Sequence, residues 1–229
     1  MKRILSLAKY QLRDNRSAVL IFYAVLIAIV LILNLGDGEG TRISGASMIF
    51  IFVAGLNCFR PSFLFAQANN ISRRSFYLAT ILALMGLAVI LGVADTLFDS
   101  LMDGYPFYHG FFEQFYPASV IAKLLWTITL LMFSASVGWM ITMFYYRANV
   151  LVKVLISMSP LVFIILASYI DQRTDGRFGN LLLNFLLTSM GFSGETPNPY
   201  PAVLSFTLAT LLVWGVNYLL VRRAPVRPY

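Results

Sequence analysis

Few side chains in this sequence have the types and spacing that catalysis or metal binding requires. Cys58 is the single cysteine, and its apolar surroundings are typical of a small buried side chain rather than a reactive thiol. His109 is the single histidine and has no cysteine, second histidine or paired carboxylate at ligand spacing. Asp95 comes nearest to the middle of an apolar run, and we place it at the outer, interfacial end of that run. The sequence therefore predicts no catalytic residue and no metal site.

Nucleotide chemistry is also missing from the sequence. The Gly-x-x-x-x-Gly-Lys-Ser/Thr loop that binds ATP phosphates does not occur. We therefore expect no cofactor on this chain, and in an ATP-driven process ATP and magnesium would be bound by a partner. The middle of each apolar run lacks paired ionisable groups, which argues against an ion-coupled transporter, although unwound backbone can also bind ions.

The composition is that of a membrane protein. Hydrophobic residues make up 59% of the 229 residues and charged residues only 12%, whereas a soluble domain has about 25% charged residues. The net charge of +7 comes from basic residues that flank the apolar runs, so it indicates membrane topology rather than nucleic-acid binding. The first apolar run is not followed by a small-residue cleavage pattern, so we expect the chain to be inserted by its own helices.

Six apolar stretches are long enough to cross a bilayer, which takes about 20 helical residues. They lie at about 17–36, 43–65, 75–97, 120–146, 152–170 and 200–221. We predict an all-α integral membrane protein with six transmembrane helices and a single domain over residues 1–229. Residues 1–16 pattern as a basic amphipathic helix on the inner leaflet, and the alternative is an ordinary charged tail.

A seventh apolar stretch, 178–194, is short, and we predict a re-entrant segment before the last span. Its apolar centre, 181–187, is interrupted by an asparagine, and the residues assigned to the re-entrant segment are Asn180, Leu183, Asn184 and Leu187. A seventh span would place Arg222 and Arg223 outside, against the positive-inside rule.

Charge then orients the chain, with both termini cytoplasmic and all but four of the 17 basic residues in inner segments. The four outer ones are Arg42, Lys123, Arg173 and Arg177.

Two features within the predicted spans bear on helix packing. Ser134 and Gly138 have the small-xxx-small spacing that lets helices approach closely, either within the chain or in a dimer. Pro160 is expected to kink the fifth span.

The inner loop between the second and third spans is the most informative segment. Asn69 and Asn70 suit a tight turn, because asparagine tolerates left-handed backbone geometry. Ser72 or Ser75 could cap the helix that follows. A short helix, a tight turn and a second helix entering the membrane are expected here, whereas the simplest alternative is a plain basic loop.

This loop resembles the first cytoplasmic loop of type-2 ABC permeases, the six-span subunits common in bacterial exporters. In that family a phrase like Asn-x-x-Ser-Arg-[Arg/Lys]-[Ser/Thr]-Phe belongs to the coupling helix that docks on the ATPase. The positions that match the phrase are Asn69, Ser72, Arg73, Arg74, Ser75 and Phe76. This chain has Asn70 where the family often has glycine. The motif covers about ten residues, while the topology match, with its N-terminal amphipathic helix and re-entrant hairpin, covers the whole chain.

The resemblance implies the permease subunit of an ATP-driven exporter in the bacterial cytoplasmic membrane. Its partners would be ABC ATPase subunits and a second permease subunit, identical or related, with no nucleic acid. We expect the ATPase to contact the loop just described and also the second inner loop, at Arg147 and Asn149. Two other classes stay open: an ATPase-independent transporter or channel, and a non-transporting anchor or sensor subunit.

Overall fold

The computed structural model describes residues 2–35, 45–102, 110–117, 119–194 and 196–224, and this part of the chain is helical with no strand. The helices are α1 (Lys2–Leu35), α2 (Ala46–Asn57), α3 (Phe59–Ala68), α4 (Arg73–Met102), α5 (Val120–Arg147), α6 (Val150–Arg173), α7 (Arg177–Met190) and α8 (Pro199–Arg222). The predicted all-α class is confirmed.

Six helical segments in the described chain are long and apolar enough to cross a membrane, with α2 and α3 together forming one of them. This is the architecture of a multi-pass membrane protein, as predicted. Helix α7 has 14 residues and is about 21 Å long at 1.5 Å per residue. It is too short for a hydrocarbon core of about 30 Å.

The first helix differs from the expectation of two separate parts. The predicted interfacial stretch 1–16 and the predicted first span are one helix, because α1 runs without a break through 34 residues. Its length of about 51 Å exceeds the hydrocarbon core by several turns. The basic first turns and the apolar span are therefore parts of one continuous helix.

The second span also differs from the single stretch at 43–65. The chain forms α2 and α3, which are separated at Cys58. Pro61 explains the break, because it has no N–H for the carbonyl of Asn57 and its ring crowds that carbonyl. Helix α3 then continues to Ala68, so it reaches the turn before α4.

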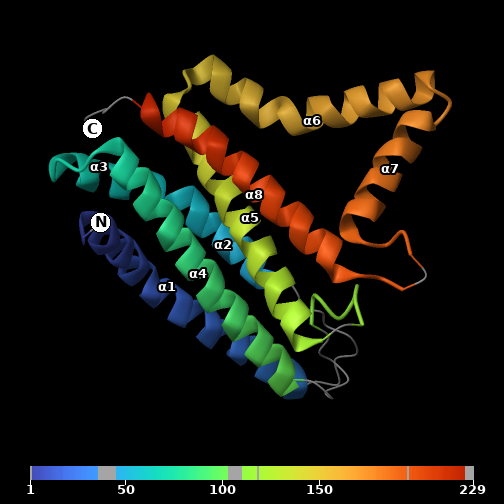
Figure 1. Cartoon of the computed structure of the whole chain (residues 1–229), viewed down its shortest axis with the longest axis horizontal. Coiled ribbons are helices and arrows are strands. Elements are labelled where there is room, and N and C mark those ends of the chain that lie inside the picture. The colour runs from blue at the N-terminus through green and yellow to red at the C-terminus, as the bar shows by residue number, and fades with distance from the viewer. Residues whose placement is uncertain (1, 36–44, 103–109, 118, 195, 225–229) are drawn as a thin grey trace.

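Helix α5 lies at the centre of the bundle and contacts α2, α4 and α8, while α1 lies on α4 (Figure 1). Helices α5 and α2 approach each other closely at two glycines. A Cβ atom on Gly55 would lie 2.2 Å from the carbonyl oxygen of Ala135, and one on Gly138 would lie 2.3 Å from that of Phe52. The small residue Gly138 therefore serves packing within the chain, one of the two alternatives that the sequence left open.

Helix α8 is joined to α5 by polar contacts at Ser136. Trp214 Nε1 donates a hydrogen bond to Ser136 Oγ at 2.8 Å, and Asn217 Nδ2 donates to the Ser136 carbonyl at 3.3 Å. Asn217 is fully buried. Tyr77 of α4 also donates to the Trp214 carbonyl at 2.9 Å, which ties α4 to the same helix.

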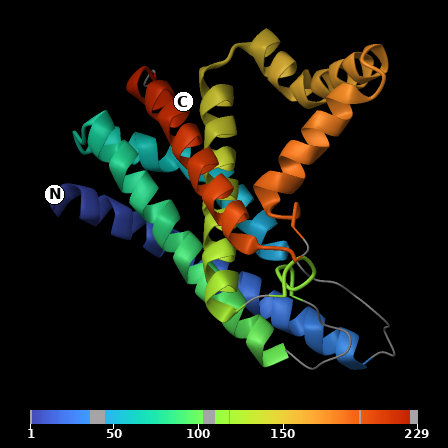
Figure 2. The same ribbon diagram turned by 45° about the vertical axis from the view of Figure 1, so that its right-hand side comes forward.

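Helices α6 and α7 stand away from this bundle and meet at a corner, as the turned view shows (Figure 2). No residue of α6 is buried, although the helix is the most apolar of the six. Pro160 lies inside α6 and has no N–H to donate to the Ile156 carbonyl. The Ser159 hydroxyl donates a hydrogen bond to that carbonyl instead, at 2.7 Å. The helix bends along its length in Figure 1, in agreement with the kink expected from Pro160.

The two ends of the described chain lie at the same end of the bundle (Figure 1). We call it the basic end: it contains the start of α1, the turn between α3 and α4, the junction of α5 and α6, and the end of α8. The opposite end, which contains the end of α4 and the start of α5, is called the outer end. An even number of crossings places both termini on one side, as the topology predicts.

The α2–α5 contact makes a testable prediction. Gly55→Ala forces backbone apart at Ala135, and we expect overpacking to cost about 1–3 kcal/mol. The melting temperature of the purified protein in detergent should fall by several degrees. Gly215→Ala is the matched control, because nothing lies within 4 Å of its new Cβ atom. Equal melting temperatures for the two variants would contradict the close contact.

Candidate functional site

The turn between α3 and α4 is built by the two asparagines that the sequence singled out. Asn69 is the C-cap of α3, and Asn70 takes a left-handed conformation with φ of 53°. The Ile71 amide donates to the Ala66 carbonyl at 2.9 Å and the Asn70 amide to the Gln67 carbonyl at 3.1 Å. These are the two bonds of a Schellman motif, with asparagine where glycine is commonest. The predicted turn chemistry is confirmed at Asn70.

Ser72 starts the next helix. Its hydroxyl accepts a hydrogen bond from the Ser75 amide at 3.2 Å and donates one to the Ser75 hydroxyl at 2.9 Å. The first bond is the side-chain cap expected at a helix N-terminus. Of the two serines that could cap α4, Ser72 does so.

An aromatic cluster of Phe59, Phe63, Phe76 and Tyr146 fixes the turn to the bundle. Phe76 of α4 is fully buried, with its ring centroid 5.9 Å from that of Phe59 and 5.3 Å from that of Phe63, both on α3. Tyr146 of α5 stands edge-on to Phe59 at 5.1 Å. These ring contacts join α3 to both α4 and α5 in a close-packed cluster.

The two arginines after the turn have different roles. Arg73 Nη1 donates to the Arg222 carbonyl at 2.8 Å, so it satisfies a free carbonyl in the last turn of α8. Arg74 is exposed at the basic end. Arg73 thus joins α4 to the end of α8, whereas the exposed side chain of Arg74 is accessible to groups outside the chain.

The second predicted contact point lies beside the aromatic cluster. Helix α5 ends at Arg147, and α6 begins at Val150 after two intervening residues, the second of which is Asn149. The Asn149 carboxamide oxygen accepts from the Val152 amide at 3.0 Å, which makes Asn149 the N-cap of α6. Arg147 is half-buried, one residue after Tyr146.

The residues of the predicted re-entrant segment lie on α7. Asn180, Leu183, Asn184 and Leu187 are all exposed, and their i, i+3, i+4, i+7 spacing places them on one face. The opposite side of α7 is joined to α8, where the Ser205 hydroxyl donates to the Ser189 carbonyl at 3.0 Å. The short length of α7 fits a segment that does not cross the membrane.

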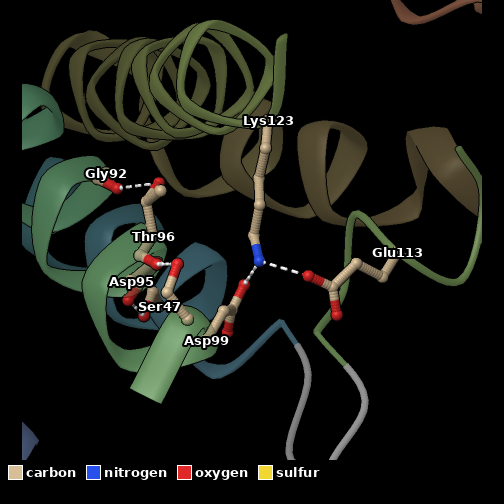
Figure 3. Close-up of polar contacts among 8 residues, drawn as sticks. Ser47, Gly92, Asp95, Thr96, Asp99, Glu113 and Lys123 are labelled. Carbon is tan, nitrogen blue, oxygen red and sulfur yellow. Dashed lines mark hydrogen bonds and ion pairs between the residues drawn. The ribbon is translucent and has the colours of Figure 1, made fainter. Parts of the chain in front are cut away.

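The outer end contains an ionic cluster that the sequence did not predict (Figure 3). Lys123, in the first turn of α5, reaches Asp99 of α4 at 2.9 Å and Glu113 of the segment 110–117 at 2.6 Å. Lys123 is only 4% exposed and Asp99 8%, so this cation and this carboxylate are both buried. The cluster joins α4, α5 and the outer segment.

Asp95 extends this polar region along α4. The Tyr23 hydroxyl of α1 and the Ser47 hydroxyl of α2 each donate to Asp95 Oδ1 at 2.7 Å. A small cavity of about 50 Å³ lies between Asp95, Asp99 and the start of α2. Asp95 and Asp99 are four residues apart, so they share a helix face, and this spacing was the signal available in the sequence.

The described part of the chain thus combines a turn at the basic end that packs against α4 and α5 with a buried ionic cluster at the outer end, among six helical segments long and apolar enough to cross a membrane. No protein-family model, curated protein or solved structure matches this chain. No group of His, Cys, Asp and Glu in the described part of the chain is arranged to hold a metal ion.

The left-handed residue of the turn gives one prediction. Asn70→Val should cost about 1–2 kcal/mol locally, because a β-branched residue resists positive φ. Hydrogen–deuterium exchange of the peptide covering residues 66–76 should become faster. Asn70→Gly is the control and should exchange as slowly as the wild type. Unchanged exchange in the valine variant would contradict the assigned role.

The ionic cluster gives another prediction. Lys123→Met removes the cation beside the buried Asp99 carboxylate, and breaking a buried pair costs about 3–5 kcal/mol. A large drop in melting temperature in detergent is expected, partly recovered when Asp99→Asn is added. Lys153→Met, at an exposed lysine of α6, is the control and should melt like the wild type. A Lys123→Met protein as stable as that control would show that the pair is not needed.

Proposed function

We propose that this chain is the membrane-spanning permease subunit of an ATP-driven exporter, with the ATPase on a separate chain. The observation that carries the proposal is the packing of the α3–α4 turn against the bundle. The turn lies at the basic end and has a defined hydrogen-bonded geometry. The rings of Phe59 and Phe63 on α3 pack against Phe76 of α4, and Phe59 also packs against Tyr146 of α5. A short, rigid segment of this kind suits a part that receives mechanical force.

In the proposed mechanism, ATP-driven closure of the ATPases pushes on residues 69–75. The force reaches α4 through Phe76 and α5 through Tyr146, and these helices then rock and open a path outward. The junction at Arg147 and Asn149 moves with them, because it directly follows Tyr146. The chain itself binds no nucleotide and carries out no catalysis; ATP and magnesium belong to the partner.

A second permease subunit, identical or related, is part of the proposal. Helix α6 supports it: Val150, Leu151, Leu155 and Phe163 are each more than 60% exposed, and the helix has no buried residue. In the membrane such a surface faces lipid or another subunit. The proposed setting is the cytoplasmic membrane of a bacterium with both termini inside, the first turns of α1 on the inner leaflet and α7 re-entrant from outside.

The Asp95 region favours a second candidate, a transporter that works without an ATPase. Three helices converge on this carboxylate through Tyr23 and Ser47, and buried ionisable groups in membrane helices often bind or relay ions. The location near the outer end and the salt bridges of neighbouring Asp99 are equally expected of a structural clamp. The two candidates are separated by whether an ATPase is associated with the chain.

The test is affinity purification of the tagged chain from native membranes in mild detergent. An ATPase should co-purify with the wild type and be lost from Arg74→Glu, because a guanidinium at a docking site pairs with carboxylates and the reversed charge repels them. Arg223→Glu is the control, an exposed arginine at the same end of the bundle.

Retention of the ATPase by Arg74→Glu would remove the α3–α4 turn from the interface. Absence of any ATPase in several detergents would overturn the permease proposal and favour the second candidate.

A further inference from the structure

A groove of about 470 Å³ opens at the basic end between the first turns of α1 and the end of α3. Its walls are Lys2, Arg3, Ser6, Leu7, Tyr10, Phe65, Asn69 and Ile71. The rings of Tyr10 and Phe65 stack across it with centroids 4.6 Å apart and planes 11° apart. The groove is therefore a defined feature between two helices that are far apart in sequence.

The lining has two chemical halves. Lys2, Arg3 and Ser6 provide two positive charges and a hydroxyl, and no acidic residue lines the groove. Asp14 is the sole acid in α1, and it lies about 16 Å along the helix from Arg3. The first turn of α1 carries no acid either, so its free N–H groups add to the positive potential.

The other half of the lining is apolar, formed by Leu7, Tyr10, Phe65 and Ile71. Tyr10 and Phe65 are 44% and 41% exposed, so their stacked rings present apolar surface at the groove rather than filling a core. A soluble anion needs no such wall. A ligand that carries a phosphate and a hydrocarbon chain matches both halves at once.

We propose that this groove binds an anionic phospholipid, with its phosphate on Lys2 and Arg3 and an acyl chain along Tyr10 and Phe65. The location fits this occupant: α1 continues from the membrane span into the basic first turns, so the groove lies where headgroups meet the apolar layer. Basic pockets on the cytoplasmic side of membrane proteins bind anionic headgroups. Which leaflet supplies the lipid rests on the orientation given under the proposed function.

Binding here has a consequence for the α3–α4 turn. Asn69 and Ile71 line the groove and also belong to the turn, where Asn69 is the C-cap and Ile71 donates to Ala66. A bound lipid holds α1 against α3 and so restrains the segment proposed to contact the ATPase. This regulatory step rests on the proposed function, whereas lipid binding itself does not.

The experiment is native mass spectrometry of the full-length protein in mild detergent, titrated with phosphatidylglycerol or phosphatidylcholine. Phosphatidylglycerol should bind and phosphatidylcholine should bind much more weakly. The variant Lys2→Gln/Arg3→Gln should bind phosphatidylglycerol roughly twenty- to thirtyfold more weakly, because each basic side chain near an anionic surface contributes about fivefold. Lys9→Gln/Arg13→Gln is the matched control, on the same helix and outside the groove, and should bind like the wild type.

A second variant, Phe65→Ala, tests the apolar half and should also weaken phosphatidylglycerol binding. Melting curves in detergent establish that each variant is folded, and the Lys2→Gln/Arg3→Gln protein keeps all its core residues.

Equal binding of the two lipids, equal loss in both double variants, or displacement of the lipid by millimolar inorganic phosphate would each overturn the proposal, the last by showing a site for free anions. These outcomes need no ATPase, so they are independent of the co-purification result.

Discussion

The close approach of α2 and α5 is the contact on which the rest of the structure depends. At Gly55 and Gly138 each helix presses its backbone against a carbonyl of the other, with no room for a single added carbon. Within a bilayer, lipid tails are as apolar as leucine side chains, so helices associate through such fitted contacts rather than through the hydrophobic effect. Once α5 is held against α2, its other sides are available to α4 and α8. The hydrogen bonds of Trp214 and Asn217 to Ser136 then fix α8 in register.

The two ends of the bundle use charge in different ways. At the outer end, Lys123 forms salt bridges with Asp99 and Glu113 inside the protein, and these salt bridges join α4, α5 and the segment 110–117. At the basic end, Arg74 and the lysine and arginine at the start of α1 remain exposed. The charges of this cluster at the outer end are thus paired within the chain, whereas the exposed cations at the basic end are accessible to anionic groups outside the chain.

The sequence predicted those features that depend on a few neighbouring residues. Asn70 and Ser72 have local preferences strong enough to specify a turn and a cap, and the structure has both. The length of the apolar run at 43–65 predicts one unbroken helix, whereas Pro61 is the residue that indicates the break at Cys58. The ionic cluster at Lys123 could not be predicted from the sequence for another reason. Its members come from two helices and a loop, so they meet only through the packing of α4 against α5.

The continuity of α1 was also beyond the sequence pattern, since a basic amphipathic stretch reads equally well as a separate helix or as the extension of a span. No proline or glycine interrupts the stretch between the two parts, and helix formation propagates more easily than it nucleates. A single rigid rod therefore connects the groove beside Tyr10 with Tyr23 and the Asp95 region at the far end.

The separation of α6 from the bundle has a consequence for how substitutions in that helix are selected. None of its side chains is buried by the rest of the chain, although the Ser157 hydroxyl shares a hydrogen bond with the Tyr145 hydroxyl of α5. At the other end of α6, the Asp171 carboxylate accepts from the Gly179 amide at 2.6 Å. Exchanging one apolar residue of α6 for another therefore leaves the folding energy of the isolated chain almost untouched. Any constraint that evolution places on the identity of those residues, beyond their hydrophobicity, must come from outside the chain, and the pattern of tolerated residues along α6 would be an imprint of its neighbour in the membrane.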